Sequence, residues 1–201
     1  GNIATTSKWY KLYKQNNPID TDDGLHPQNI FRIVTRLTWD GNIRQEVYAN
    51  IVIDQLSASP NRNASNGILL FNRYKDANNL YYAGIRVDGA VVVKKKLNGK
   101  YYTLAQKQLF FGATYNRDTN VNLLPKNKWI GVRADTVTNA DKSVTVKLFI
   151  DEGKTGKWTE VLSAVDNGIA YGGPVIEAPG YGGFRTDFMD VLFDDYRIIK
   201  I

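Results

Sequence analysis

The residues best suited to chemistry in this sequence are arginine, lysine, tyrosine and asparagine side chains that recur at alternate positions of short apolar segments. Because successive side chains of a strand point to opposite faces, these polar residues are predicted to lie opposite an apolar face. The set nearly lacks carboxylates, and exposed tyrosine beside arginine is typical of recognition surfaces. An ordinary solvent-facing surface is the alternative interpretation. The members of the set are Arg32, Arg36, Tyr48, Asn50, Asn72, Tyr82, Arg86, Lys95, Tyr102 and Arg133.

Residues of these types suit β-elimination on a uronic acid polymer. That reaction removes the C5 proton while the adjoining carboxylate is neutralised, which lowers the pKa of the proton. Arginine or asparagine can neutralise the carboxylate, and tyrosine or histidine can act as base and acid. We therefore assign Tyr82, Tyr102, Arg86 and His26 as candidate catalytic residues, and the other members of the set as candidate substrate-binding residues.

Other chemistries fit the composition poorly. Glycoside hydrolysis usually needs two carboxylates at a fixed separation, whereas the chain has only four Glu and no acidic pair at strand spacing on these faces. One histidine and no cysteine disfavour a zinc site. His26 lies in a turn-rich segment without a nucleophile elbow, and the glycines of 172–173 and 180–183 precede no helix that could bind phosphate. No basic run exceeds 94–96, so we do not expect nucleic-acid binding.

The elements that must position these residues are short strands. Period-two alternation with one apolar face runs over 31–38, 46–54, 129–135 and 144–151, and 67–74 and 191–199 read as further strands. No stretch shows a helical period of useful length. Ten or so strands with frequent turns predict an all-β, two-sheet antiparallel sandwich. The side chains predicted to face inward include Val47, Ala49, Ile51, Ile130, Val132, Ala134, Val146, Leu148 and Ile150.

Two turn signals set the register in the middle of the chain. Asp88-Gly89 and Asn98-Gly99 predict two-residue hairpin turns between three consecutive strands. Arg86 and Lys95 lie in mid-strand and could hardly be buried without partners, so their face is predicted to be exposed. With Val87 opposite Ala90, that face carries Tyr82, Arg86, Lys95 and Tyr102, and the core face carries Ala83, Ile85, Val87, Val92 and Ala105.

Length and charge set further bounds. The 201 residues fit one domain, with an N-terminal strand and loop in 1–29 and the sandwich body in 30–201. No segment reaches the roughly 18 apolar residues of a membrane span, and no signal peptide is present, so we expect a mature form or an excised domain of a secreted monomer. The net charge of +6 favours an anionic partner, although cations scattered for solubility would give the same value.

The segments 129–133 (Trp-Ile-Gly-Val-Arg), 146–151 (Val-Lys-Leu-Phe-Ile-Asp) and 183–198 carry a resemblance. They are similar to the concanavalin A-like jelly rolls, a group that includes laminin-G-like domains, carbohydrate-binding modules and the alginate and glucuronan lyases. The resemblance implies a β-jelly roll rather than one activity. Arg32 and Arg36 resemble the Arg-containing strand of the alginate lyases, whereas His26 lies in a loop instead of a Gln-x-His strand.

The resemblance also implies a structural Ca²⁺ that bridges the last strand to the first. Asp194 or Asp195 would ligate it, since hard oxygen ligands suit Ca²⁺; solvated or Arg-paired acids are the alternative. Two functional hypotheses follow. The first is a secreted lyase that binds an acidic polysaccharide in a cationic, Tyr-lined groove and cleaves it by β-elimination. The second is a non-catalytic carbohydrate-binding or laminin-G-like module, which would release no unsaturated product.

Overall fold

The protein is described from a computed structural model that covers residues 4–16, 30–53 and 61–201. Over these ranges the chain forms one helix, α1 (Lys8–Asn16), and eleven strands. The strands are β1 (Ile30–Val34), β2 (Ile43–Ile53), β3 (Gly67–Asp76), β4 (Asn79–Arg86), β5 (Ala90–Leu97), β6 (Lys100–Gln108), β7 (Trp129–Thr138), β8 (Val144–Glu152), β9 (Thr159–Asp166), β10 (Tyr181–Asp187) and β11 (Asp190–Lys200). The described helix is too short to cross a membrane.

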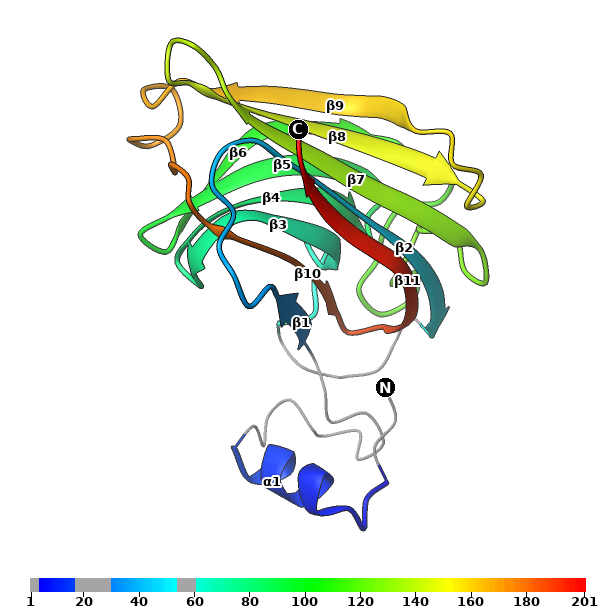
Figure 1. The fold of residues 1–201 in the computed structure, drawn as a ribbon. Helices are drawn as coiled ribbons and strands as arrows, with labels where there is room; N and C mark the ends of the chain where they lie inside the picture. The colour runs from blue at the N-terminus through cyan, green and yellow to red at the C-terminus, as the bar shows by residue number, and fades with distance from the viewer. Residues whose placement is uncertain (1–3, 17–29, 54–60) are drawn as a thin grey trace.

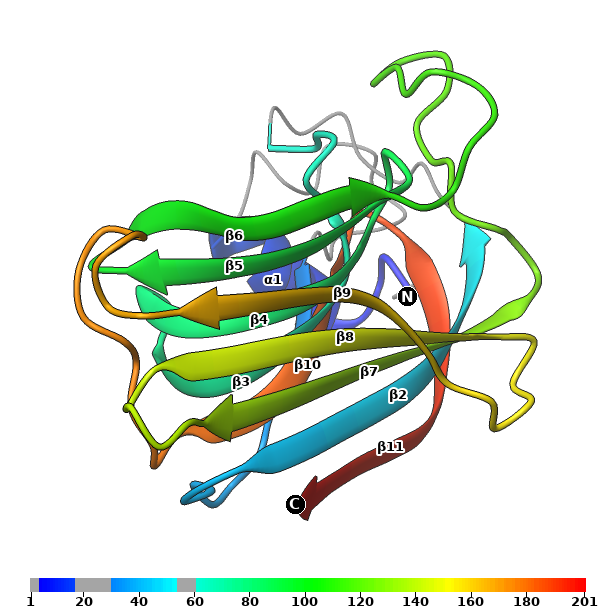
Figure 2. The same ribbon diagram turned by 90° about the horizontal axis from the view of Figure 1, so that it is seen from above.

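The strands form two antiparallel sheets that face each other (Figure 1). The strand order is β1-β10-β3-β4-β5-β6 in the six-stranded sheet and β11-β2-β7-β8-β9 in the five-stranded sheet. Seen from above, the two layers overlie each other with β6 close to β9 along one side (Figure 2). This arrangement confirms the predicted all-β jelly-roll sandwich.

Apolar side chains from both sheets meet between the layers. Val47, Ala49 and Ile51 of β2 are buried there, as are the alternate apolar residues of β7 and β8, which confirms the predicted inward faces. At one side the rings of Phe31, Phe184 and other aromatic residues continue this core. The period-two pattern predicts the buried faces of these strands correctly because each strand has one face on the core and one in solvent.

The turn between β4 and β5 is one residue longer than the sequence signal predicts. Tyr82 pairs with Lys94, so the loop between the two strands comprises residues 87–89. Gly89 has a φ of 82°, whereas Asp88 has no positive φ. A type I′ turn needs positive φ at both central residues, but a type I turn followed by one left-handed glycine needs it only once. The predicted two-residue turn at this position is therefore wrong.

The longer turn shifts β5 by one residue against β4 and so exchanges the two faces of β5. The side chain of Lys95 lies between the sheets and is 0% exposed, whereas Lys94 lies beside Tyr82 on the outer face. Val92, which was predicted in the core, also lies on the outer face. The prediction that Lys95 shares an exposed face with Tyr82 is wrong.

The second hairpin has the predicted two-residue turn. Asn98 and Gly99 have φ values of 50° and 81°, as a type I′ turn requires. As far as Thr103, opposite Lys94, β6 keeps this register against β5 and so follows the exchange of faces. A register shift between Val93 and Lys94 then places Ala105 opposite Val93, on the core side where it was predicted. Tyr102, opposite Lys95, packs against the core, while Tyr101 is 55% exposed. The predicted exposed position of Tyr102 is therefore wrong as well.

Lys95 can be buried because a carboxylate and two carbonyl oxygens surround its ammonium group. Lys95 Nζ lies 2.8 Å from Asp166 Oδ2 and donates to the carbonyl oxygens of Gly173 (2.8 Å) and Pro174 (3.2 Å). The Tyr81 hydroxyl donates to the same Asp166 oxygen at 2.6 Å. Buried charges are tolerated when they are paired and hydrogen-bonded in this way.

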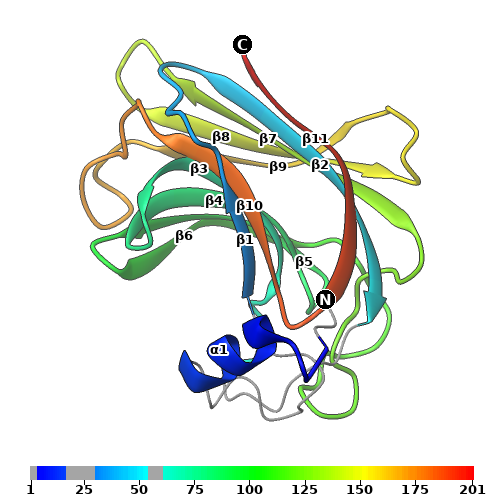
Figure 3. The ribbon, with the colours of Figure 1, turned by 60° about the horizontal axis from the view of Figure 1, so that its bottom comes forward.

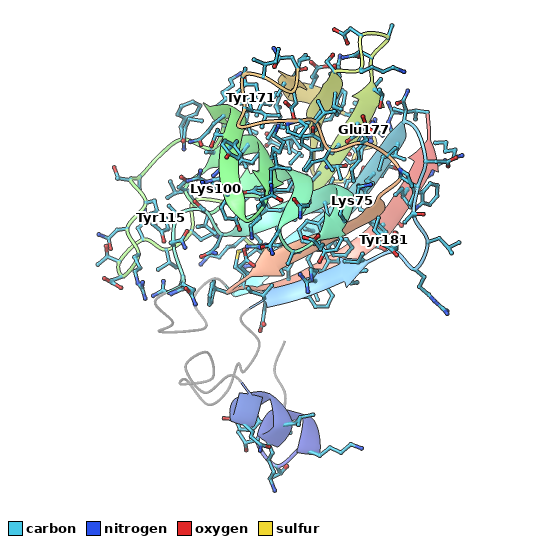
Figure 4. All side chains as sticks on the ribbon, turned by 90° about the vertical axis from the view of Figure 1, so that its left-hand side faces the viewer. Lys75, Lys100, Tyr115, Tyr171, Glu177 and Tyr181 are labelled. Carbon is cyan, nitrogen blue, oxygen red and sulfur yellow. The ribbon has the colours of Figure 1, made fainter. Side chains whose placement is uncertain are left out.

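The same contacts fasten the segment 167–180 to the end of the sandwich. In Figure 4 this segment runs from Tyr171 past Glu177 to Tyr181. Arg73, which is 2% exposed, donates from Nη1 to the carbonyl oxygen of Ile176 at 3.1 Å. Lys95 and Arg73 therefore fix the segment 167–180, which connects β9 to β10 and forms no strand.

The described part of the N-terminal region contains the helix α1, where the sequence analysis expected a strand and a loop. Ser7 precedes it, and the Ser7 hydroxyl oxygen accepts a hydrogen bond from the Tyr10 backbone N–H at 3.2 Å. A serine in this position satisfies one of the unpaired donors of the first helical turn. The serine cap is the sequence signal for this helix, which has no apolar period long enough to predict it.

Candidate functional site

A groove of about 490 Å³ lies on the outer face of the six-stranded sheet. Its floor is an apolar cluster, separate from the main core, that includes Leu69 and Phe71 of β3 and Leu80 and Tyr82 of β4. Figure 3 shows these strands beside β10 and β1. Asparagine and serine side chains of the segment 61–66 line one rim, so amide groups stand beside the apolar floor.

Cationic side chains line the groove from both sides of this floor. Arg32 comes from β1 and Arg185 from β10, while Lys94 and Lys96 come from β5. Among the described lining residues none carries a carboxylate. Arg185 has a carboxylate partner at the edge, since its Nη2 lies 2.7 Å from an oxygen of the buried Asp187. The groove is therefore predominantly cationic.

At both ends of the groove a cationic side chain lies over an aromatic ring. The Arg32 guanidinium carbon lies 5.9 Å from the centre of the Tyr74 ring, and Lys96 Nζ lies 4.7 Å from the centre of the Tyr101 ring. Tyr101 in turn meets the Tyr82 ring edge to face, with the ring centres 6.1 Å apart. Cation–π contacts orient a positive charge without cancelling it. The groove thus combines flat aromatic surface with positive charge that an anion can still reach.

Burial changes the acidity of two groups in the groove. It raises the pKa of Tyr82 above its usual range, so the Tyr82 phenol stays protonated at neutral pH. Burial, and after it the nearby Arg86 cation, lowers the pKa of Lys94. An anion bound next to Lys94 would offset both effects, because an opposite charge favours the ammonium form.

Of the predicted site residues, Arg32 and Tyr82 line the groove. Arg86 lies on the same face of β4 but is only 9% exposed. Its guanidinium donates to Asp88 at 2.5 Å and to Gln106 at 3.1 Å. The prediction of an exposed Arg86 without partners is therefore wrong, since the turn next to it supplies a carboxylate. His26 falls outside the described residues.

Other predicted residues lie away from the groove. Tyr48, Asn50 and Arg133 are on the outer face of the five-stranded sheet. Asn72 is 0% exposed, and its side-chain oxygen accepts a hydrogen bond from Gln45 of the opposite sheet at 2.8 Å. Arg36 lies in the exposed connection after β1. Their predicted common surface is wrong because alternation gives the face of a strand but not the sheet that contains it.

Tyr48 belongs to a structural cluster on that second sheet. Its hydroxyl donates to Asp151 Oδ2 at 2.6 Å, and its ring centre lies 5.4 Å from that of Trp158. The Arg133 guanidinium carbon lies 4.2 Å from the centre of the Trp158 ring, and Arg133 also pairs with Glu46 at 2.8 Å. These contacts account for the burial of Tyr48 and for the position of Arg133 over an aromatic ring, so neither residue requires a ligand.

Replacement of Tyr48 with phenylalanine is expected to reduce stability more at neutral pH than in acid. Burial alone would raise the pKa of Asp151, but hydrogen bonds from Thr155, Tyr48 and Gly156 outweigh it and hold the pKa below its usual value. A depressed folded-state pKa stabilises the protein above the unfolded pKa of about 3.9, and this contribution is lost as the pH falls. Urea unfolding at several pH values should show the deficit of Tyr48→Phe shrinking below about pH 4. A deficit independent of pH would contradict this account.

The sequence analysis missed several residues that line the groove. The predicted register puts Lys94, Lys96 and Tyr101 on the face opposite to that of Tyr82, and Arg185 is not among the candidate residues. The signal that could have found the first three is Gly89, because a single glycine after Val87-Asp88 also fits a three-residue turn. With that register the positions 94, 96 and 101 fall beside Tyr82.

The two carboxylates proposed as calcium ligands have a lysine partner. Lys154 Nζ lies 2.5 Å from an oxygen of Asp194 and 3.0 Å from an oxygen of Asp195. Over the described ranges, no group of three or more histidine, cysteine or acidic side chains is arranged to hold a metal ion. An ammonium group thus holds the carboxylate pair together, and calcium binding stays a prediction.

The fold has counterparts among solved structures. The carbohydrate-binding module CBM66 from Bacillus subtilis matches with a TM-score of 0.54 and 16% identity, over 85% of this chain and 82% of the module. This likeness establishes the fold. A xylan β-1,4-xylosidase from Bacillus halodurans matches with a TM-score of 0.49 and 10% identity over 87% of this chain, which spans only 30% of that enzyme. An alginate lyase from Klebsiella pneumoniae matches with a TM-score of 0.36 and 13% identity, over 81% and 60% of the two chains. No family model and no curated protein matches the sequence.

Proposed function

We propose that the protein binds an acidic polysaccharide in the groove of the six-stranded sheet. The observation that carries this proposal is the combination of Lys94, Lys96, Arg32 and Arg185 with a floor that bears aromatic rings. Flat rings suit the apolar faces of sugars, and ammonium and guanidinium groups suit carboxylates. The asparagine-rich rim adds amide groups for sugar hydroxyls. The similar fold of a carbohydrate-binding module supports this assignment.

The geometry favours binding over cleavage by β-elimination. A base that removes the C5 proton works best with a pKa near the working pH, whereas burial raises the pKa of Tyr82. Tyr102, the second tyrosine assigned to catalysis, packs against the core. The lyase hypothesis would therefore need another base, and the test below includes a readout for cleavage. The expected extracellular location and monomeric state accompany this proposal as predictions.

The test measures the binding of the protein to polygalacturonate and to neutral glycans by isothermal titration calorimetry. Lys94→Met is expected to weaken polygalacturonate binding at least tenfold, since a hydrogen bond to a charged group contributes about 1.5–3 kcal/mol. Tyr82→Phe should bind as the parent does, because the variant keeps the ring. Added salt should weaken the binding of the parent protein, since screening reduces the attraction between exposed charges.

Lys107→Met is the matched control, because Lys107 is exposed on β6 and lies outside the groove. It loses the same charge and should leave the affinity unchanged. Equal losses in Lys94→Met and Lys107→Met would show attraction to net charge rather than a site. Unsaturated products detected by ultraviolet absorbance, and abolished in Tyr82→Phe, would favour the lyase hypothesis instead.

A further inference from the structure

The positive charges of the groove are grouped at its two ends in arrangements that repel. Arg32 and Arg185 are directly opposite each other on β1 and β10. Lys94 and Lys96 point to the same side of β5, because they are two residues apart on one strand. Like charges directly opposite each other, as Arg32 and Arg185 are, destabilise a sheet. A local arrangement that works against folding is most easily explained by a ligand, since functional sites are where such conflicts persist.

At each end of the groove, cationic side chains outnumber the carboxylates that form salt bridges with them. At the first end Arg185 pairs with Asp187, while Arg32 donates to the Tyr74 hydroxyl at 3.4 Å. At the second end Lys96 lies over the Tyr101 ring, and Asp76 and Asp88 lie close enough to attract Lys96 and Lys94 respectively. Over the described ranges, no salt bridge joins either lysine to a carboxylate. Each end therefore retains charge for at least one anionic group.

The ends are separated by an apolar floor two strands wide. The sheet order places β3 and β4 between β10 and β5, and these two strands contribute Leu69, Phe71, Leu80 and Tyr82 to the floor. Adjacent strands lie about 4.8 Å apart, so three spacings separate β10 from β5 by about 14 Å. Lys94 and Lys96 also lie two and four residues along the strands from the position in line with Arg185, which lengthens the span between the two ends to roughly 16–20 Å. A disaccharide is shorter than this span, whereas a longer oligosaccharide can reach both ends.

We propose that a single acidic oligosaccharide lies across the strands and places one carboxylate at Arg32 and Arg185 and another at Lys94 and Lys96. The sugars between them lie on the apolar floor. This inference rests on the proposed function and adds the orientation of the ligand, the spacing of its charges and a minimum length. Once one end is bound, the second contact is intramolecular, so affinity should rise steeply when the oligomer becomes long enough to bridge.

The experiment titrates the protein with oligogalacturonates of increasing length, from the disaccharide to the octasaccharide. Bridging predicts a gain of about a hundredfold between the shortest and the longest oligomers, with one long oligomer bound per protein. Arg32→Met and Lys94→Met should each remove most of that gain and lower disaccharide affinity only about twofold, since one end remains. Methyl-esterified oligomers of the same lengths should show no gain, because they lack the charges.

Lys107→Met is again the control and should keep the full dependence on length. Far-ultraviolet circular dichroism of each variant checks that the sheets are intact. Losses that are the same for every oligomer length, or a gain that survives in Arg32→Met, would overturn the bridging arrangement while leaving acidic-polysaccharide binding in place. Absence of binding to the polymer and to every oligomer would instead overturn the proposed function.

Discussion

Replacement of Asp166 with asparagine is expected to lower the free energy of unfolding by about 3–5 kcal/mol, the usual effect of removing one partner of a buried ion pair. The substitution keeps the size of the side chain but leaves the Lys95 ammonium between the sheets with carbonyl oxygens alone. It also weakens the acceptor of the Tyr81 hydroxyl. Urea denaturation of the parent and the variant measures the difference.

An exposed ion pair provides the control for this prediction. Lys147 and Glu160 lie 3.0 Å apart with side chains 44% and 41% exposed, so Glu160→Gln should cost less than about 1 kcal/mol. The double variant Lys95→Met/Asp166→Asn should be less destabilised than the sum of its two single variants, because no charge is left unpaired. If Asp166→Asn were as mild as Glu160→Gln, the buried pair would not hold segment 167–180 as described.

Replacement of Gly84 with alanine is expected to cost about 3 kcal/mol, at the upper end of overpacking effects. Gly84 lies on the groove side of β4, opposite Leu69 of β3. A Cβ atom there would overlap the carbonyl oxygen of Ile68, which belongs to the backbone and cannot rotate away. The two central strands of the groove would have to separate, so ligand binding should fall together with stability.

Gly156→Ala separates steric overlap from the loss of glycine's conformational freedom. Gly156 has a φ of 77° and nothing within 4 Å of its missing Cβ, so alanine should cost only the left-handed backbone penalty of about 1–2 kcal/mol. Thermal and urea unfolding of the two variants would compare them directly. A Gly84→Ala protein with parental stability would mean that β3 and β4 are not as close as the structure has them.

The sequence predicted the architecture well because alternation depends only on which face of a strand is buried. Val47 and Ile51 of β2 and Val146 and Leu148 of β8 lie where the pattern placed them. The predicted faces of β5 and of the start of β6 are wrong because they depended on the length of a single turn. Asp88-Gly89 is compatible with loops of two and of three residues, and the choice decides whether Lys94 or Lys95 faces solvent.

The candidate site was harder to predict than the fold. Tyr48 and Arg133 share a residue pattern with Arg32 and Tyr82, but they belong to the other sheet. Strand order across a sandwich is set by long-range pairing, which a single sequence does not record. Burial of polar residues was also underestimated, because the partner that makes it tolerable is distant: Lys95 finds Asp166 on a strand of the opposite sheet.

The position of β10 between β1 and β3 has a consequence for how the molecule is made. Phe31 pairs with Thr186 and Leu70 with Phe184, so the six-stranded sheet cannot be completed until β10 has left the ribosome, more than 100 residues after β3. Until then β3 presents an unpaired edge of apolar residues, and such edges pair readily with other chains. Contacts of this sequence separation raise the contact order, and sandwiches of high contact order fold in milliseconds to seconds rather than microseconds. The interval between synthesis of β3 and arrival of β10 is therefore the period in which this protein is most exposed to aggregation.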